Sequence, residues 1–371
     1  MGAVLLAALL AARLDAAVET GGHVGSQTAG ARDLAELQPS LTGTLEQPAL
    51  RLQGRYAPRF LWSADQHLGL RHEGLFAGNW QQSRNLQWTA SENFRYGRND
   101  FIQDAGATRP FDFVETLVPV IADDLSTDTE LGFGLVASRT VGLSASVGYL
   151  TYGGRSAASQ RVLPFQHGPQ LWFGLDQDLT RNDRVSTEMY ASQSFASGDR
   201  QNSQLKLSES WQSQLGPTTR SKLSVGASAW RKWRPVEGGS AGWFPVASAA
   251  LERDVLQRRQ RFELRALASV GPHMNPLTAE LLERAELGVS ARWIRQDNLS
   301  IRGRAAAARE LAAGGSRLAQ GTLDVSYQPK PDISISVGAG AFWQQVPSLP
   351  DTPALRWLAF TALTFGARNL I

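Results

Sequence analysis

Cysteine is absent from the 371 residues of this chain, and histidine and methionine are scarce, with five and three residues. The lack of cysteine excludes disulfides, thiol chemistry and the cysteine-ligated zinc and iron–sulfur sites. It also suits a chain that passes through an oxidising compartment. His67 and His72 are an odd number of residues apart, which puts them on opposite faces of a strand, and the sequence contains no phosphate-binding glycine loop and no calcium loop. The sequence therefore predicts no cofactor and no metal site.

Long apolar runs are also missing. Residues 3–12, AVLLAALLAA, are too few to cross a bilayer as a helix. Followed by Arg13 and the small residues Ala16 and Ala17, this run is typical of a signal peptide, which we expect over 1–17. Beyond it no stretch approaches the about 18 apolar residues of a transmembrane helix. Any membrane-spanning segment must then consist of strands.

The sequence also lacks an excess of charge of one sign. The 37 lysines and arginines nearly balance the 34 acidic residues, for a net charge of +3, and the basic residues are scattered singly. Nucleic-acid-binding domains usually carry clustered basic residues. We therefore expect no nucleic-acid partner.

What the sequence does contain is alternation with a period of two. In residues 50–62, LRLQGRYAPRFLW, leucine and aromatic side chains occupy one face, and arginines occupy the other. A strand presents successive side chains to opposite faces, so a strand between lipid and water must alternate in this way. Similar runs occupy residues 67–80, 86–98, 261–270, 286–293, 333–341 and 355–365.

The length of these runs favours a membrane barrel over a soluble β fold. Strands of soluble β proteins usually hold about 5–6 residues. Many runs here reach about 11–14 residues, enough for a tilted strand to cross the hydrocarbon layer. The sequence therefore predicts an all-β protein, a transmembrane antiparallel up-and-down β-barrel.

The connections predict the orientation and size of this barrel. Short turns are expected at 45–48, 81–85, 138–142, 180–183, 215–219, 255–259, 295–298 and 328–332, and mostly longer loops at 99–128, 153–166, 197–203, 234–242, 272–282, 311–316 and 345–354. Outer-membrane barrels have short turns on the periplasmic side. Counting from residue 49 predicts about 16 strands, in a range of about 14 to 18. Residues 18–36 are expected to be a flexible periplasmic leader, and 37–371 the barrel domain, with 37–44 as a half-strand of no assigned place.

Four segments resemble the outer-membrane β-barrel porins of Gram-negative bacteria. They are LRLQGRYAPRFLW (50–62), GNWQQSRNLQWTASENFRYG (78–97), TELGFGLVASRTVGLSASVGYLTYGG (129–154) and GPQLWFGLDQDLTRNDRVSTEMYASQSF (168–195). The resemblance implies a place in the cell outer membrane, contact with its lipid and insertion by the barrel-assembly machinery. Barrels of this kind commonly end on an aromatic residue, whereas this chain continues past Phe365 to Ile371.

Charged side chains on the inward faces are the candidate pore-lining residues. We interpret them as lining a water-filled pore with a slight anion preference, for porin-like passive diffusion of small hydrophilic solutes or ions. The alternative is a closed lumen braced by ion pairs. The candidates are Arg51, Arg55, Arg59, Arg71, Glu73, Arg95, Glu263, Arg265, Arg292 and Arg302.

The loop 99–128 is a candidate constriction. Its segment RPFDFVETLVPVIADD (109–124) is apolar enough to pack, and it could fold into the barrel. There it would present Asp112, Glu115, Asp123 and Asp124 to the arginines. It could equally cap the outside or form contacts within a homo-oligomer.

Two other functional classes are kept open. An outer-membrane lipase or protease would need a nucleophile with a nearby histidine, and no G-x-S-x-G or comparable motif accompanies the histidines. We therefore expect no catalytic residues and no enzyme activity. The other class is a non-conducting structural or assembly barrel, such as part of an export or surface-polysaccharide system.

Overall fold

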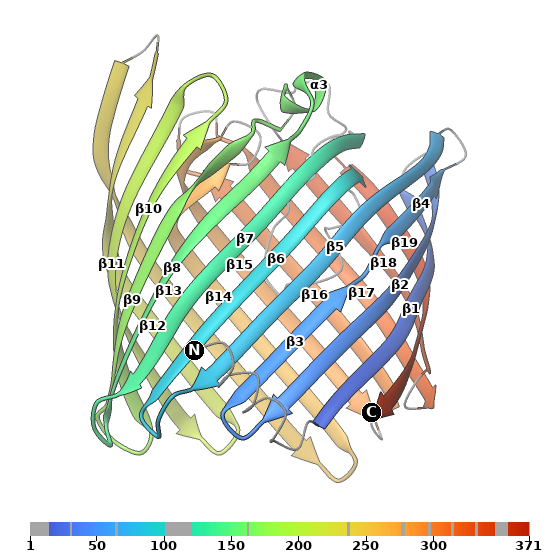
Figure 1. Ribbon diagram of the computed structural model, residues 1–371, viewed down its shortest axis with the longest axis horizontal. Helices are drawn as coiled ribbons and strands as arrows, with labels where there is room; N and C mark the ends of the chain where they lie inside the picture. Colours follow the sequence, from blue (N-terminus) through green and yellow to red (C-terminus); the bar gives the residue numbers. More distant parts are fainter. Residues whose placement is uncertain are drawn as a thin grey trace, which may run out of the picture.

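The computed structural model describes residues 15–29, 32–63, 66–100, 121–161, 163–235, 238–275, 279–295, 298–312, 315–330, 333–345 and 355–370. These residues form one antiparallel sheet in which β1 (Asp15–Ala29) pairs with both β2 (Arg32–Gln47) and β19 (Leu355–Leu370), so that the sheet closes on itself (Figure 1). The prediction of an up-and-down barrel is confirmed.

Chain neighbours are sheet neighbours throughout the barrel. The remaining strands are β3 (Leu50–Tyr56), β4 (Arg59–Ser63), β5 (Gln66–Gln81), β6 (Leu86–Asp100), β7 (Ile121–Val136), β8 (Val141–Gly154), β9 (Gln166–Asp178), β10 (Asp183–Ala196), β11 (Arg200–Gly216), β12 (Thr219–Arg234), β13 (Gly238–Gln257), β14 (Gln260–Asn275), β15 (Glu280–Arg295), β16 (Leu299–Glu310), β17 (Arg317–Lys330) and β18 (Ile333–Gln345). A short helix, α3 (Ala157–Gln160), lies between β8 and β9.

Strands β3 and β4 are two halves of one strand. Both pair with β2 on one side and with β5 on the other. They are separated at Ala57 and Pro58, and proline has no N–H to donate to the sheet. The nineteen labelled segments therefore make eighteen strands, inside the predicted range and two above the central value.

The two additional strands correct the prediction of a flexible leader over 18–36. Asp15–Ala29 and Arg32–Gln47 form a hairpin, and the first of these strands closes the barrel against β19. Apolar and polar residues alternate too weakly in residues 20–30 for the sequence to predict a strand there. The strand forms nevertheless, because its backbone pairs with β2 and β19, and backbone hydrogen bonds do not require an apolar face. The barrel thus begins at Asp15 rather than at residue 37, and β2 contains the predicted half-strand 37–44. Residues 1–14 of the expected signal peptide lie outside the described residues.

The two rims differ in their connections. At the lower rim of Figure 1, where β1 begins and β19 ends, the turns are short, such as Pro48–Ala49 and Arg258–Arg259. By the general rule for outer-membrane barrels this rim faces the periplasm. At the upper rim, the connection from β8 to β9 contains α3.

Several predicted long loops are wrong, because strands extend into them. The expected loop 197–203 reduces to 197–199, and the expected loop 234–242 reduces to 235–237. Strand β13 has 20 residues, about twice what a tilted strand needs to cross the hydrocarbon. Its hairpin with β12 rises above the upper rim in Figure 1. Apolar alternation ends where the lipid ends, whereas backbone pairing continues into water.

Cross-strand register assigns each side chain to one face of the barrel. Leu207, Val225 and Leu287, at 55%, 66% and 62% exposure, lie on the outward face together with most exposed aromatic residues. Few apolar side chains of the described chain are buried, and most of these are small, such as Ala57 and Ala196. The apolar surface of this fold is therefore turned outward, as contact with lipid requires. No helix among the described residues is long and apolar enough to cross a membrane.

Candidate functional site

The register places the candidate charged residues on the inward face, in two groups. The first group, on β3–β6, is here called the first wall: Arg51, Arg55, Arg59, Arg71, Glu73 and Arg95. The second group, on β14–β16, is called the second wall: Glu263, Arg265, Arg292, Arg302 and the neighbouring Arg304. Strands β5 and β14 are nine strands apart in an eighteen-strand ring, so the two walls face each other across the lumen.

The centre of the first wall is an ion pair packed into the barrel. Arg71 is 1% exposed, and its Nε lies 3.4 Å from Oε1 of Glu73. The other carboxylate oxygen of Glu73 accepts a hydrogen bond from Nε2 of Gln38, at 3.0 Å. Arg59, also buried, is the cross-strand partner of Arg71. A buried guanidinium requires such partners, because desolvation of an unpaired charge is costly.

Toward the lower rim the first wall is open to solvent. Arg51 lies on β3 opposite Glu46, and its Nε is 3.1 Å from that carboxylate, with both side chains more than half exposed. Such a pair contributes little to stability in water. The first wall thus combines a buried, ion-paired centre with an exposed pair near the periplasmic side.

The second wall holds arginines at closer quarters. Arg292 and Arg302 are direct cross-strand partners. Arg265, Arg292, Arg302 and Arg304 line a cavity of ≈ 170 Å³ together with Glu263 and Ser290. The ion pairs of this group are long. Glu263 lies 3.9 Å from Arg292, and Glu252 lies 3.9 Å from Arg265. This wall is therefore basic and only loosely neutralised.

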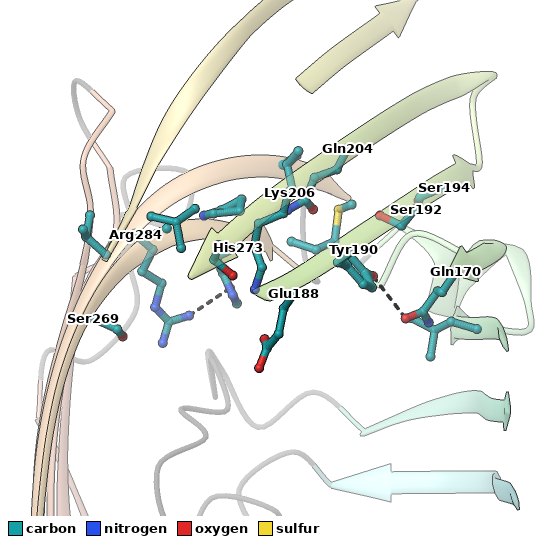
Figure 2. A pocket seen from close by; sticks show the side chains of 18 of the residues that line it. Gln170, Glu188, Tyr190, Ser192, Ser194, Gln204, Lys206, Ser269, His273 and Arg284 are labelled. Atoms are coloured by element: carbon teal, nitrogen blue, oxygen red, sulfur yellow. Dashed lines mark hydrogen bonds between the residues drawn. The ribbon is translucent and has the colours of Figure 1, made fainter. Parts of the chain in front are cut away.

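A larger cavity of ≈ 580 Å³ lies on the inward face of β9–β15 and extends toward the upper rim. Figure 2 shows Tyr190 of β10 projecting into it, and Tyr190 donates its hydroxyl hydrogen to Oε1 of Gln170, at 3.1 Å. Hydroxyl and amide side chains, including Ser192, Ser194 and Gln204, line a large part of the cavity.

Most charges of this cavity are paired. Lys222 lies 3.8 Å from Oε1 of Glu188. Arg284, at 1% side-chain exposure, pairs with Glu286 at 2.9 Å and donates to Nε2 of His273 at 2.8 Å (Figure 2). Hydroxyls, amides and an aromatic ring with few free charges suit a ligand rich in hydroxyl groups.

Aromatic side chains continue beside this cavity on the inward face. Trp172 of β9 is the cross-strand partner of Tyr190. Trp230 of β12 stacks on Phe244 of β13, with ring centroids 5.4 Å apart and planes inclined by 24°. Lys232 lies over the Trp230 ring, at 4.8 Å from its centroid. These rings break the simple rule that aromatic residues of a barrel face the lipid.

The candidate constriction lies only partly within the described residues. Asp112 and Glu115 fall in 101–120, outside the described chain. Asp123 and Asp124 lie in β7 and not in a loop, because β7 already begins at Ile121. Asp124 is buried, on the inward face near the upper rim, opposite Gly97. For these two residues the expected loop position is wrong.

Sequence reasoning missed the larger cavity. Its residues lie partly in the segment 168–195, where Tyr190 is the aromatic member of a polar series at even positions. This single aromatic ring on a polar, inward face was the sequence feature that could have indicated a binding cavity. Arg304 was likewise visible as an inward residue, but its closeness to Arg292 depends on the register of β15 and β16.

Solved structures with a similar fold are outer-membrane proteins. The FrpB iron transporter from Neisseria meningitidis superposes with a TM-score of 0.55 at 7% identity, over 88% of this chain and 63% of that chain. This chain therefore spans less than two thirds of FrpB. OprD from Pseudomonas aeruginosa is 11% identical over 97% of this chain and 96% of that chain, with a TM-score of 0.49. No curated protein sequence matches.

The closed eighteen-strand sheet and its likeness to FrpB define an outer-membrane β-barrel. The protein resides in the outer membrane of a Gram-negative cell. Residues 4–369 match the EpsX exopolysaccharide export family. The chain belongs to that family.

Proposed function

We propose that this protein forms the passage through which an exopolysaccharide strand crosses the outer membrane. The observation that carries the proposal is membership of the exopolysaccharide export family over nearly the whole chain. A barrel of eighteen strands supports it, because barrels of 16–18 strands can enclose an aqueous channel.

The inward face of β9–β13 has the chemistry that a sugar polymer needs. Sugar hydroxyls exchange hydrogen bonds with side chains such as Ser192 and Gln204, and the apolar faces of sugar rings pack against aromatic rings such as Tyr190. Many weak and similar contacts hold a polymer without trapping it, and conduction needs binding that is weak enough to release.

A second candidate is the porin-like passive diffusion of small hydrophilic solutes or ions. The basic inward residues of both walls favour it. We propose no catalytic role for the barrel. The two transport functions differ in what a cell without this protein loses: surface polysaccharide in the first, small-solute permeability in the second.

The test is a deletion strain complemented with two variants of β10. Tyr190→Ala removes the inward ring, and Met189→Ala, its matched control, truncates the neighbouring side chain on the outward face. We expect deletion to abolish surface polysaccharide. Met189→Ala should restore it, and Tyr190→Ala should restore about fivefold less, the equivalent of about 1 kcal/mol of ring contact.

Normal surface polysaccharide in the deletion strain would contradict export. If small-solute uptake fell at the same time, the porin-like function would replace it. Equal export by the two variants would remove Tyr190 from the proposed path.

A further inference from the structure

Two cross-strand rows of side chains meet in the second wall. In each row, neighbouring strands place their residues directly opposite one another. The row nearer the lower rim reads Glu263, Arg292, Arg302 and Asp324, and the next row reads Glu252, Arg265, Ser290, Arg304 and Thr322. Arg292 and Arg302 thus stand side by side with like charge, and Arg304 stands between two neutral residues.

The neighbouring positions of Arg292 and Arg302 cost stability. Like charges directly opposite one another on neighbouring strands are destabilising. Within the described chain, Arg302 and Arg304 form no ion pair, and Nε of Arg292 is buried without a hydrogen-bond partner. Elsewhere on the inward face, Arg184 lies 2.7 Å from Asp178 and Arg261 lies 2.5 Å from Asp254. In the second wall, Glu263 and Asp324 stand at the two ends of the lower row, and the Glu263 carboxylate lies 3.9 Å from Arg292. Arg304 has a neutral residue on each side.

The arginines of the second wall enclose a space that is large enough for a carboxylate. The four arginines surround a cavity of ≈ 170 Å³, and one water needs only about 10–15 Å³. Guanidinium groups bind carboxylates through paired hydrogen bonds. A carboxylate in this cavity would satisfy Arg292 and relieve the repulsion between Arg292 and Arg302.

The position in the barrel indicates which carboxylate. Arg302 and Arg304 are the fourth and sixth residues of β16, which begins at Leu299 at the rim of the short turns. A polymer entering from the periplasm would meet this wall before the hydroxyl-lined cavity of β9–β15. Charged entrances attract ligands of opposite charge and raise their association rates.

We infer that the second wall is a binding site for acidic sugar residues of the exported polymer. The arginines of the wall bind the carboxylates of these sugar residues. This inference rests on the proposed function. It assigns a substrate class, a polysaccharide carrying carboxylates, and gives the periplasmic side of the lumen the task of capturing it.

The test measures the binding of sugar oligomers to the refolded, full-length barrel. The probes are an oligomer of galacturonate, a glucose oligomer of equal length, and acetate at the same carboxylate concentration. The variant is Arg302→Gln with Arg304→Gln, and the control is Arg51→Gln, which removes an arginine at the same end of the opposite wall. Binding is read as the rise in unfolding temperature, since a ligand of the folded state stabilises it, and as block of single-channel current.

We expect galacturonate oligomer to bind wild type and Arg51→Gln alike, and to bind the double variant at least about tenfold more weakly, a change of about 1.4 kcal/mol. A second variant, Thr322→Glu, supplies a carboxylate opposite Arg304 from the chain itself. Thr322→Glu should also weaken the binding of the galacturonate oligomer, although it retains every arginine. The test therefore still decides if the double variant fails to fold.

Three results would overturn the inference: equal binding by the double variant, equal stabilisation by the glucose oligomer, or equal stabilisation by acetate. The last would identify a site for any small anion rather than for a sugar acid. The glucose oligomer separates this inference from the proposed function. A barrel blocked equally by both oligomers would lose only the acidic specificity, whereas a barrel that neither oligomer enters would lose the proposed export path.

Discussion

Both walls of the lumen carry arginines, but the first wall has a buried, ion-paired arginine at its centre, whereas the arginines of the second wall line a cavity. On the first wall, Arg71 is buried, and Glu73 and Gln38 connect it to the neighbouring strands. On the second wall, Arg292, Arg302 and Arg304 surround a cavity, with the closest carboxylate of that cavity 3.9 Å away. The same residue type braces the barrel on one side and remains available to a ligand on the other.

This difference shows that inward charge alone does not define a pore. Arg71 contributes to stability because its charge is satisfied inside the protein, and it has little to offer a passing ion or sugar. Arg304 has no such partner within the described chain. A structural arginine is paired with a carboxylate of the protein, whereas a functional arginine can still bind a ligand. The positions of the carboxylates decide between the two.

The largest expected effect tests the structural side of the comparison. Glu73→Gln removes the carboxylate beside a guanidinium that is 1% exposed. Removing the carboxylate that pairs with this buried charge should lower the free energy of unfolding by about 3 kcal/mol. Urea unfolding of the refolded barrel in lipid vesicles measures it.

The control is Glu46→Gln, which removes the partner of the exposed Arg51. Its cost should stay below about 1 kcal/mol, as for other exposed pairs. Equal losses in Glu46→Gln and Glu73→Gln would show that the first wall has no structural centre.

An intermediate effect is expected on ion selectivity. Arg302→Gln with Arg304→Gln removes two unpaired charges from the lumen, and one charge acts on an ion at 4 Å with about 1 kcal/mol in water. The anion-to-cation permeability ratio, taken from the reversal potential, should therefore fall about fivefold. The fall should be clear in 0.1 M salt and nearly lost in 1 M salt, where the screening length drops from about 10 Å to about 3 Å.

Glu46→Gln is again the matched control for this measurement, because it changes the charge of the opposite wall by one unit in the other direction. It should raise the anion preference slightly. A selectivity that is the same in wild type and the double variant would place the second wall outside the ion path.

The smallest effect concerns the stability of the second wall itself. Arg302 stands between Arg292 and Asp324 and forms no ion pair with Asp324. Arg302→Gln therefore removes more repulsion than attraction and should raise the free energy of unfolding by about 0.5 kcal/mol, within the range of cross-strand pairs. Chemical unfolding at low salt measures it. A loss of stability would mean that Arg302 is engaged by the protein, and the contrast between the walls would disappear.

Much of the fold was predictable, because the face of each residue is a local property. The alternation in 50–62 and 333–341 places leucines and arginines on opposite faces in any register, and the register of β3, β5 and β18 agrees with it. The apolar, outward face and the outer-membrane location follow from that pattern. The number of strands was less certain, because β1 and β2 alternate weakly and are recognised by their pairing with β19 and β3.

The candidate site was predictable only as a set of inward charges. The alternation alone does not distinguish Arg71 from Arg302, although the residue two places along the same strand is Glu73 in one case and Arg304 in the other. Each of the two stands opposite another arginine, Arg59 or Arg292. What differs is the third group: Gln38 of β2 holds the carboxylate of Glu73 beside Arg71, whereas Asp324 stands opposite Arg302 without an ion pair between them. The aromatic rings of β9–β13 were not predicted as a site for the same reason.

By itself the sequence determined the class of structure, the sidedness of most strands and the membrane in which they lie, because a period of two in a barrel separates lipid from water residue by residue. The tertiary structure alone decided that the N-terminal hairpin closes an eighteen-strand ring, which arginines are paired, and which cavities the inward side chains leave. These properties depend on register and curvature, which join residues far apart in the chain.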